Sequence, residues 1–369
     1  MNILVTGAKG FIGQNLIAEL KNRGYQDIFE FDKDTDPKRL ESYCKNADFV
    51  YHLAGVNRPV DQSEFMEGNF GFTSELLDNL KKYKNTCPIM LSSSIQAELN
   101  NPYGESKKAG EELLFKYSEE TGSKVLIYRF PNVFGKWSRP NYNSAVATFC
   151  HNITRGLPIQ VNDPSVLMSL VYIDDVVAEL IRALSSDEHK VGHYCEVEIQ
   201  HQIKLGEIVD LLHSFNKSRD DKFIPNLSDA FTKKLYSTFL SFLPEDQFSY
   251  ALKMNVDHRG SFTEFLKTHD FGQVSVNVSK PGITKGNHWH HTKNEKFLVV
   301  SGQGVIRFRN INSEQVIEYH VSGEKLEVID IPVGYTHNIE NLGSNDLVTI
   351  MWANELFDVN HPDTYFLEV

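Results

Sequence analysis

Three histidines and one glutamate in the last third of the chain have the residue types and the spacing of metal ligands. His288 and His290 stand two residues apart, so on a β-strand their side chains point to the same face. Glu295 follows on what we expect to be the next strand, and His337 comes from a distant hairpin. Three imidazoles and one carboxylate suit Zn, Fe, Mn or Ni. The sequence therefore predicts a site for a divalent metal, with zinc as the expected ion.

A tyrosine and a lysine in the first half of the chain have the spacing of an acid–base pair. Tyr103 and Lys107 lie four residues apart, so on a helix they share one face. A lysine ammonium there lowers the pKa of the phenol, which can then donate a proton to a carbonyl that receives hydride. Because this spacing is also common on solvated helix surfaces, the pair gains meaning only from the elements around it.

Those elements begin with a glycine-rich turn at the start of the chain. The apolar strand 1–6 runs into Gly7-Ala8-Lys9-Gly10-Phe11-Ile12-Gly13, and the following helix repeats apolar residues every four positions. Glycines allow the backbone to turn tightly and to approach a pyrophosphate at the helix N-terminus. Asp32 ends the next strand about 20 residues later, where a ribose-binding carboxylate is expected. Further buried strands follow at 47–55 and 88–94.

With the segment 129–135 downstream, these features make the first two-thirds of the chain resemble the extended short-chain dehydrogenase/reductase family, whose members mostly act on nucleotide sugars. The resemblance implies a Rossmann-like, doubly wound parallel sheet with a smaller substrate-binding lobe. Tyr103 and Lys107 become catalytic, and Asn132 contacts the substrate. The catalytic serine of the family maps to the run 92–94, where we prefer Ser94, with Ser93 next. The residues implied for the nicotinamide cofactor are Gly7, Lys9, Gly10, Phe11, Ile12, Gly13, Asp32, Lys33, Leu53, Ala54 and Lys107.

The form of the nicotinamide cofactor depends on the charges near its ribose. Asp32 favours a free 2′-hydroxyl and hence NAD. Lys9 and Lys33 oppose it, because two lysines can neutralise a 2′-phosphate, and related NADPH-dependent reductases carry a basic residue at the position of Lys9. We expect NADPH.

The end of the chain resembles the cupin family. Its two motifs stand in order as Gly282-x5-His288-x-His290-x4-Glu295-x6-Gly302 and Pro332-x-Gly334-x2-His337-x3-Asn341. One departure is Leu326, where the second motif usually has glycine. Short alternating strands and glycine-rich turns after residue 257 also suit a jelly-roll barrel. We expect a reductase domain at 1–245, which a helical pair over 226–243 closes, and an all-β cupin domain at 246–369.

Within the expected barrel, segments 257–264 and 285–288 resemble the deoxysugar 3,5-epimerases. In that family the histidine matching His288 removes a proton next to a ketone, which implies a catalytic role here. If His288 binds a metal instead, its lone pair is occupied, and Tyr335 or His337 must be considered as the base. Arg259 is expected to bind a substrate phosphate, although a structural salt bridge is the plain alternative.

A chain that joins such a reductase to such a cupin resembles the bifunctional capsular polysaccharide enzymes on the path to UDP-N-acetyl-L-fucosamine. The resemblance implies a UDP-linked 2-acetamido-4-keto-6-deoxyhexose as substrate. The cupin inverts C3 through an enolate, which the metal or a hydrogen bond stabilises. The reductase then delivers hydride to C4, giving UDP-2-acetamido-2,6-dideoxy-L-talose.

Length and composition limit the number of domains, the classes of partner and the cellular compartment. At 369 residues the chain exceeds one ordinary core, which favours two domains. A formal net charge of −12 argues against nucleic acid or an anionic membrane as partner. No apolar run reaches the ~18 residues of a membrane span, and the first residue leads directly into a strand, so no signal peptide is expected. The four cysteines are widely spaced and fit reduced thiols in a cytoplasmic enzyme.

Three alternatives remain open at this point. The chain could be a 4-ketoreductase whose cupin has only a structural role. It could be a non-catalytic NADP(H) sensor, although such sensors usually lose the tyrosine or lysine of the pair. The metal ligands could also serve an Fe(II) oxygenase. Because edge strands of cupin barrels commonly pair between copies, we expect a homodimer.

Overall fold

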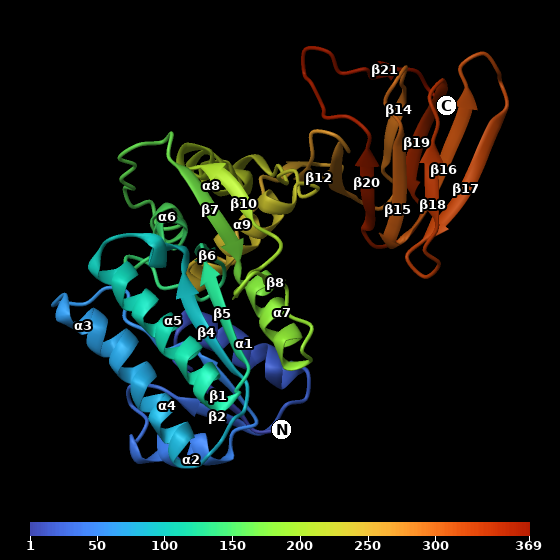
Figure 1. The fold of residues 1–369 in the computed structure, drawn as a ribbon. Helices are drawn as coiled ribbons and strands as arrows, with labels where there is room; N and C mark the ends of the chain where they lie inside the picture. Colours follow the sequence, from blue (N-terminus) through green and yellow to red (C-terminus); the bar gives the residue numbers. More distant parts are fainter. The chain divides into compact units, whose positions relative to one another are not determined.

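The computed structural model describes residues 1–369 and divides the chain into two compact units (Figure 1). The first unit comprises Met1–His213 and Ser228–Pro244, and the second comprises Ser214–Leu227 and Glu245–Val369. None of the helices combines the length and the apolar character needed to cross a membrane. The two units are described in turn.

The first unit is built on a seven-stranded sheet with the order β2-β1-β3-β4-β5-β9-β8. All neighbouring strands are parallel except β8 and β9. Because β2 lies on one side of β1 and β3 lies on the other, the strand order reverses at β1. The carboxyl end of β1 is therefore the switch point at which such sheets bind ligands. The strands are β1 (Ile3–Thr6), β2 (Ile28–Phe31), β3 (Phe49–His52), β4 (Ile89–Ser94), β5 (Val125–Phe130), β8 (Lys190–Val191) and β9 (Tyr194–Cys195).

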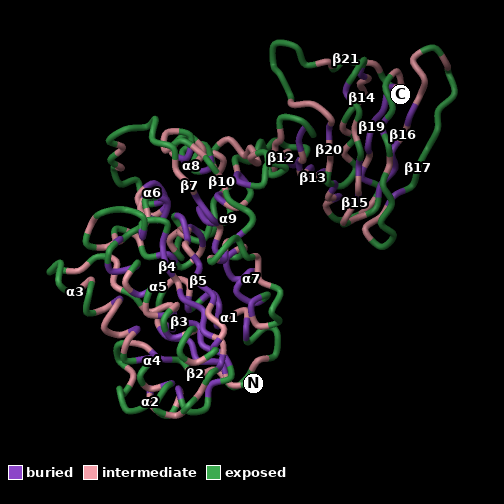
Figure 2. Tube along the Cα trace, viewed as in Figure 1, coloured by how far each residue is buried: buried purple, intermediate pink, exposed green.

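Helices cover both faces of this sheet, because successive residues of a buried strand point to opposite sides. Ile3 packs in a cluster with the first face's helices, and Leu4 packs in a separate cluster with those of the second face. The helices of the first face are α1 (Phe11–Asn22) and α7 (Ile173–Leu184); those of the second face are α2 (Lys38–Asn46), α4 (Phe72–Lys82) and α5 (Pro102–Thr121). Figure 2 shows the buried residues gathered along the strands between them.

A small three-stranded sheet of order β10-β7-β6 forms the additional lobe of this unit. Its elements are β6 (Asn132–Phe134), β7 (Leu167–Tyr172), β10 (His201–Lys204), α6 (Ala145–Ile153) and α9 (Ala230–Ser241). The predicted pair of helices over residues 226–243 was wrong. A single helix occupies most of this stretch, and Asp229 sets its start by capping it, its side chain accepting the Thr232 N–H at 2.7 Å.

The second unit is an antiparallel barrel of two sheets with the orders β11-β12-β13-β20-β15-β18 and β17-β16-β19-β14-β21. Phe297, Ile306, Phe308 and Ile339 belong to the apolar cluster between them. The strands are β11 (Asn255–Asp257), β12 (Gly260–Lys267), β13 (Gln273–Ser279), β14 (Thr284–Trp289), β15 (Glu295–Ser301), β16 (Gln303–Asn310), β17 (Val316–Ser322), β18 (Val328–Ile331), β19 (Tyr335–Asn341), β20 (Leu347–Ala353) and β21 (Tyr365–Phe366). The predicted fold class, a Rossmann-like sheet followed by an all-β cupin-like barrel, is confirmed.

One short segment belongs to the barrel although it lies before it in the sequence. The Ile224 N–H donates to the Lys267 carbonyl at 2.8 Å, and the Lys267 N–H donates to the Lys222 carbonyl at 2.9 Å, so these residues extend the pairing of β12. Phe223 stacks on His269 with ring centroids 4.4 Å apart. This long-range pairing was not anticipated from the sequence, and the expected domain bounds of 1–245 and 246–369 stay a prediction.

Candidate functional site

The glycine turn after β1 has a backbone that only glycine can form. Gly7 has a φ of +69°, and a Cβ there would lie 2.7 Å from the backbone nitrogen of Ala54. A Cβ at Gly13 would collide with the Gly7 carbonyl oxygen. The Leu53 N–H donates to the Thr6 carbonyl at 3.2 Å, which fixes the loop after β3 beside the turn. The sequence candidates Gly7, Gly13, Leu53 and Ala54 therefore meet at the switch point.

The helix that follows the turn has a free N-terminus. Gly10 precedes α1 and provides no side-chain cap, and the first turn contains no acidic residue. The N–H groups of Phe11 and Ile12 at the start of α1 are therefore available to an anion, and the helix dipole favours one there. This arrangement fits the pyrophosphate of a dinucleotide.

The charged residues expected near the cofactor ribose form a small network. Asp32 accepts the Lys9 N–H at 2.8 Å and the Lys33 N–H at 2.8 Å. The Lys9 ammonium pairs with Asp34, and this hydrogen bond raises the pKa of Lys9. Lys33 is exposed. Sequence reasoning missed Asp34, whose signal was its place two residues after Asp32 in the same loop.

The predicted acid–base pair comes together on α5. The Lys107 ammonium lies 5.9 Å from the centre of the Tyr103 ring and donates to the Ser92 carbonyl at 3.1 Å. Burial lowers the pKa of Lys107 to about 8. Burial also raises the pKa of Tyr103, while its hydrogen bond with Ser94 partly offsets that rise. The phenol can therefore keep its proton until a substrate oxygen accepts it.

The two candidate serines point to different partners. The Ser93 hydroxyl donates to Glu111 at 2.5 Å, and Glu111 is held by two bonds from Arg129, at 2.9 and 2.7 Å. Ser94 instead bonds with Tyr103, so the structure places Ser94 beside the acid–base pair. Asn132, proposed for substrate contact, is exposed, and its side-chain amide donates to the Ser169 carbonyl at 3.3 Å.

Two asparagines that sequence reasoning missed also lie at this pair. The Tyr103 hydroxyl donates to Asn57 Oδ1 at 3.4 Å. Asn69 is buried in a π-helical turn, Met66–Gly71, and donates to Ser106 Oγ at 2.9 Å. Such turns are frequent at functional sites. No sequence signal marked either asparagine, because both come from an irregular connection.

The predicted metal ligands come together inside the barrel. His288 lies on β14, Glu295 begins β15, His337 lies on β19, and His290 follows the end of β14. One ligand atom from each residue lies within 4.8 Å of the others. Asn287, with a φ of +58°, forms a bulge in the pairing of β14 with β19, after which His288 stands directly opposite His337.

The cluster fits a divalent cation. The Nε2 atoms of His290 and His337 lie 3.4 and 3.3 Å from Glu295 Oε2, but none of these three buried atoms has a hydrogen-bond partner. Since His290 Nδ1 faces a carbonyl oxygen at 2.5 Å, it carries the proton, and its Nε2 presents a lone pair to the carboxylate. Facing lone pairs repel one another unless a cation lies between them.

The protonation state of His288 agrees with this geometry. Burial lowers the pKa of His288 to about 4, so its imidazole is neutral and able to bind a metal at neutral pH. His288 therefore offers the lone pair of a neutral imidazole.

Two further candidates of the barrel lie in different surroundings. Tyr335 is two residues from His337 on β19, so it shares that face, and it packs against the apolar cluster of the barrel. Arg259 is half exposed on the turn between β11 and β12 and forms a salt bridge with Asp257 at 2.6 Å. The structure thus gives Arg259 a partner within its own hairpin.

Comparisons with known proteins cover both units. Residues 3–197 match the NAD dependent epimerase/dehydratase family, and residues 255–365 match the polysaccharide biosynthesis C-terminal domain. The chain is 47% identical over 369 residues to the UDP-2-acetamido-2,6-beta-L-arabino-hexul-4-ose reductase of Pseudomonas aeruginosa, covering 100% of this chain and 99% of that one.

Solved structures agree with this result. The capsular polysaccharide assembling protein CapF from Staphylococcus aureus superposes with a TM-score of 0.96 at 60% identity and covers 100% of both chains. The NAD complex of UDP-glucose 4-epimerase from Thermus thermophilus is 20% identical, covers 66% of this chain and 99% of that one, and has a TM-score of 0.54. At that identity it shows the fold of the first unit alone.

Proposed function

This chain belongs to the NAD dependent epimerase/dehydratase family, and we propose that it is a bifunctional nucleotide-sugar enzyme of capsular polysaccharide synthesis. Its likeness to CapF over the full length confirms the expected resemblance to the capsular polysaccharide enzymes that join such a reductase to such a barrel. The proposed substrate is a UDP-linked 2-acetamido-4-keto-6-deoxyhexose, and the product is UDP-2-acetamido-2,6-dideoxy-L-talose, on the path to UDP-N-acetyl-L-fucosamine. The related hexul-4-ose reductase supports this substrate class.

The first unit is proposed to reduce the ketone at C4. NADPH, when bound, supplies the hydride for that carbon. Tyr103 donates its proton to the ketone oxygen as the C–H bond forms, so the alcohol leaves without a charged intermediate. Lys107 stabilises the resulting phenolate from the same helix face, and Ser94 orients the ketone oxygen toward the phenol.

The choice of NADPH rests on Lys9 in the glycine turn after β1 and on Lys33 in the loop after β2, both beside the expected ribose position. Asp32 has both oxygens engaged by backbone N–H groups, so its carboxylate is held in place by the protein itself. A 2′-phosphate would pair with Lys9 in place of Asp34.

The barrel is proposed to invert C3. A base removes the C3 proton, the electron pair moves onto the ketone as an enolate, and a proton returns to the opposite face. A metal ion held by His288, His290, Glu295 and His337, expected to be zinc, supplies positive charge that favours this deprotonation. Because His288 then uses its lone pair as a ligand, Tyr335 is the preferred base, and His288 is the base if the ion is held by the other residues.

The observation that carries this proposal is that one chain contains both a complete tyrosine–lysine pair and a complete histidine–glutamate cluster. Reduction alone would not require the cluster. We also propose that the enzyme is a cytoplasmic homodimer, with the reductase at 1–245 and the epimerase at 246–369.

An NMR time course of the 4-keto sugar nucleotide in deuterated water tests both activities. Without NADPH we expect deuterium to enter C3 while the ketone remains. With NADPH the ketone should disappear, and the product should carry deuterium at C3 in the inverted configuration. Reduction without exchange at C3 would reduce the proposal to a 4-ketoreductase with a structural barrel, and exchange without reduction would remove the reductase.

A further inference from the structure

The end of the chain forms a strap along the strand that carries His288. The strap, Pro362–Leu367, contains β21, which pairs with β14 so that Phe366 stands opposite His288. The Leu367 N–H donates to the Asn287 carbonyl at 3.0 Å, and the Thr336 hydroxyl donates to the Leu367 carbonyl. The strap therefore lies against the strand that carries one ligand and is tied to the strand that carries another.

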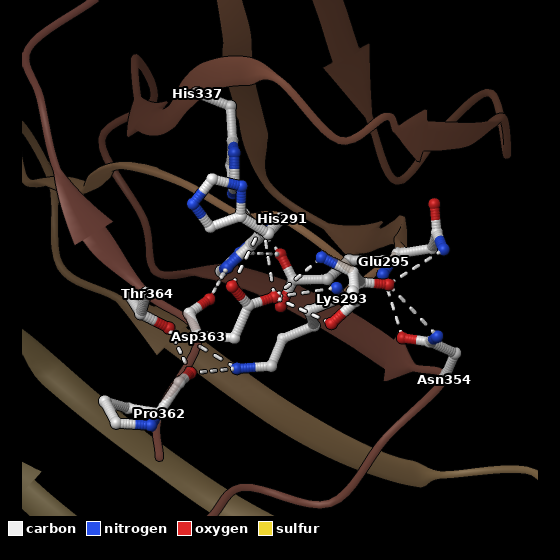
Figure 3. Close-up of polar contacts among 11 residues, drawn as sticks. His291, Lys293, Glu295, His337, Asn354, Pro362, Asp363 and Thr364 are labelled. Atoms are coloured by element: carbon white, nitrogen blue, oxygen red, sulfur yellow. Dashed lines mark hydrogen bonds and ion pairs between the residues drawn. The ribbon is translucent and has the colours of Figure 1, made fainter.

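A single carboxylate in the strap organises the turn between His290 and Glu295. Asp363 accepts the N–H of His291 at 3.0 Å, of Thr292 at 2.8 Å and of Lys293 at 2.9 Å (Figure 3). It also accepts the Thr292 hydroxyl at 3.1 Å. Three successive N–H groups directed at one anion form a backbone nest, a geometry that fixes the path of the chain. That path sets the separation between two of the four metal ligands.

The backbone of the same residue contacts a metal ligand directly. The Asp363 carbonyl oxygen accepts the Nδ1–H of His290 at 2.5 Å. Its φ of +38° is rare for a residue with a side chain, so the neighbouring bonds must hold this backbone in place. One of them comes from the buried Lys293, whose ammonium donates to the Pro362 carbonyl at 2.7 Å.

We propose that Asp363 is a positioning residue for the metal centre, acting through the nest at residues 291–293 and through its carbonyl on His290. The carbonyl selects the imidazole tautomer with the proton on Nδ1, which leaves Nε2 as the metal-binding atom. A partner of this kind orients a ligating histidine and raises its basicity. This inference rests on the proposed metal centre and adds the segment that assembles it.

The test compares metal binding by full-length variants. Asp363→Asn keeps the size of the side chain but directs an amide at N–H donors, and Lys293→Met removes the second anchor of the strap while keeping an apolar stem. Asp358→Asn is the matched control, because this substitution makes the same change of charge in an exposed turn. The Asp358 side chain bonds only Asn360 and His361. Zn²⁺ affinity is measured by competition with a chelator, and the site is followed by the visible absorption of bound Co²⁺.

We expect Asp363→Asn and Lys293→Met each to lower Zn²⁺ affinity about 10–100-fold and to change the Co²⁺ spectrum, while Asp358→Asn matches the wild type. Thermal unfolding of the metal-free proteins distinguishes an effect on protein stability from an effect on metal binding. Lower metal-free stability with unchanged affinity and spectrum would overturn the positioning role. If the wild-type protein binds neither Zn²⁺ nor Co²⁺, the proposed metal centre itself fails; if it binds both and Asp363→Asn binds equally well, only the role of Asp363 fails.

Discussion

The buried ammonium of Lys107 should destabilise the first unit at neutral pH. Burial lowers its pKa from 10.5 to about 8, and its side chain is 8% exposed. A difference of about 2.5 pKa units corresponds to about 3 kcal/mol, at 1.36 kcal/mol for each unit. Because the folded pKa lies below the unfolded value, this cost is fully present below pH 8 and is relieved as pH rises from 8 to 10.5.

Replacing Lys107 with Met removes the charge and keeps an apolar stem of similar length. The loss of the hydrogen bond to the Ser92 carbonyl subtracts about 1 kcal/mol from the gain. We therefore expect the unfolding free energy of the first unit to rise by about 1–2 kcal/mol at pH 7. NADPH-dependent reduction should fall about 10²–10⁴-fold, because Tyr103 loses its cationic partner.

Urea unfolding followed by circular dichroism at 222 nm measures this change in the full-length protein, since nearly all helices belong to the first unit. The control is Lys108→Met, the exposed neighbour on α5, which should change stability by less than about 0.5 kcal/mol. The advantage of Lys107→Met over the wild type should shrink between pH 8 and pH 10.5. A variant that is less stable at pH 7, or a difference that does not depend on pH, would refute the reasoning.

Three further predictions concern the cofactor, the proton donor and the metal. Tyr103→Phe should lower NADPH oxidation about 10²–10⁴-fold while fluorescence titration still shows cofactor binding; turnover at the wild-type rate would contradict its role. Lys9→Ala combined with Lys33→Ala should weaken NADPH and leave NADH nearly unchanged in the same titration, whereas equal losses would indicate general damage. His290→Ala or Glu295→Ala should lower the metal content found by elemental analysis while reduction at C4 survives; full metal occupancy would exclude them as ligands.

The fold class was predictable because the decisive residues have strict local requirements. Gly7 needs a positive φ and a close approach to the loop after β3, and such a requirement is visible in a single sequence. His288 and His290 are fixed by the alternation of a strand, and Tyr103 and Lys107 by the repeat of a helix. Each of these two pairs therefore came together as expected within its own unit, although the roles of the residues stay predictions.

The remaining parts depend on contacts that a sequence does not display. Ser93 and Ser94 are adjacent hydroxyls at the end of one strand, and only their partners on α5, Glu111 for Ser93 and Tyr103 for Ser94, separate them. Asp363 lies far from the metal ligands in the sequence and reaches them through a strap with little regular structure. A long-range pairing of this kind leaves no periodic pattern.

The preference for NADPH depends on how the lysines near the ribose position are already paired. The two loops that should meet the 2′-position carry Lys9 and Lys33 but also Asp32 and Asp34, so their formal charges cancel. Lys9 is already paired with Asp34, and both side chains are mostly exposed, at 64% and 65%. An exposed pair contributes little, so exchanging Asp34 for a phosphate requires only a small free energy. A doubly charged phosphate that accepts from two lysines exceeds that cost. The preference for NADPH should accordingly be modest, and it should weaken as added salt screens the exposed lysines.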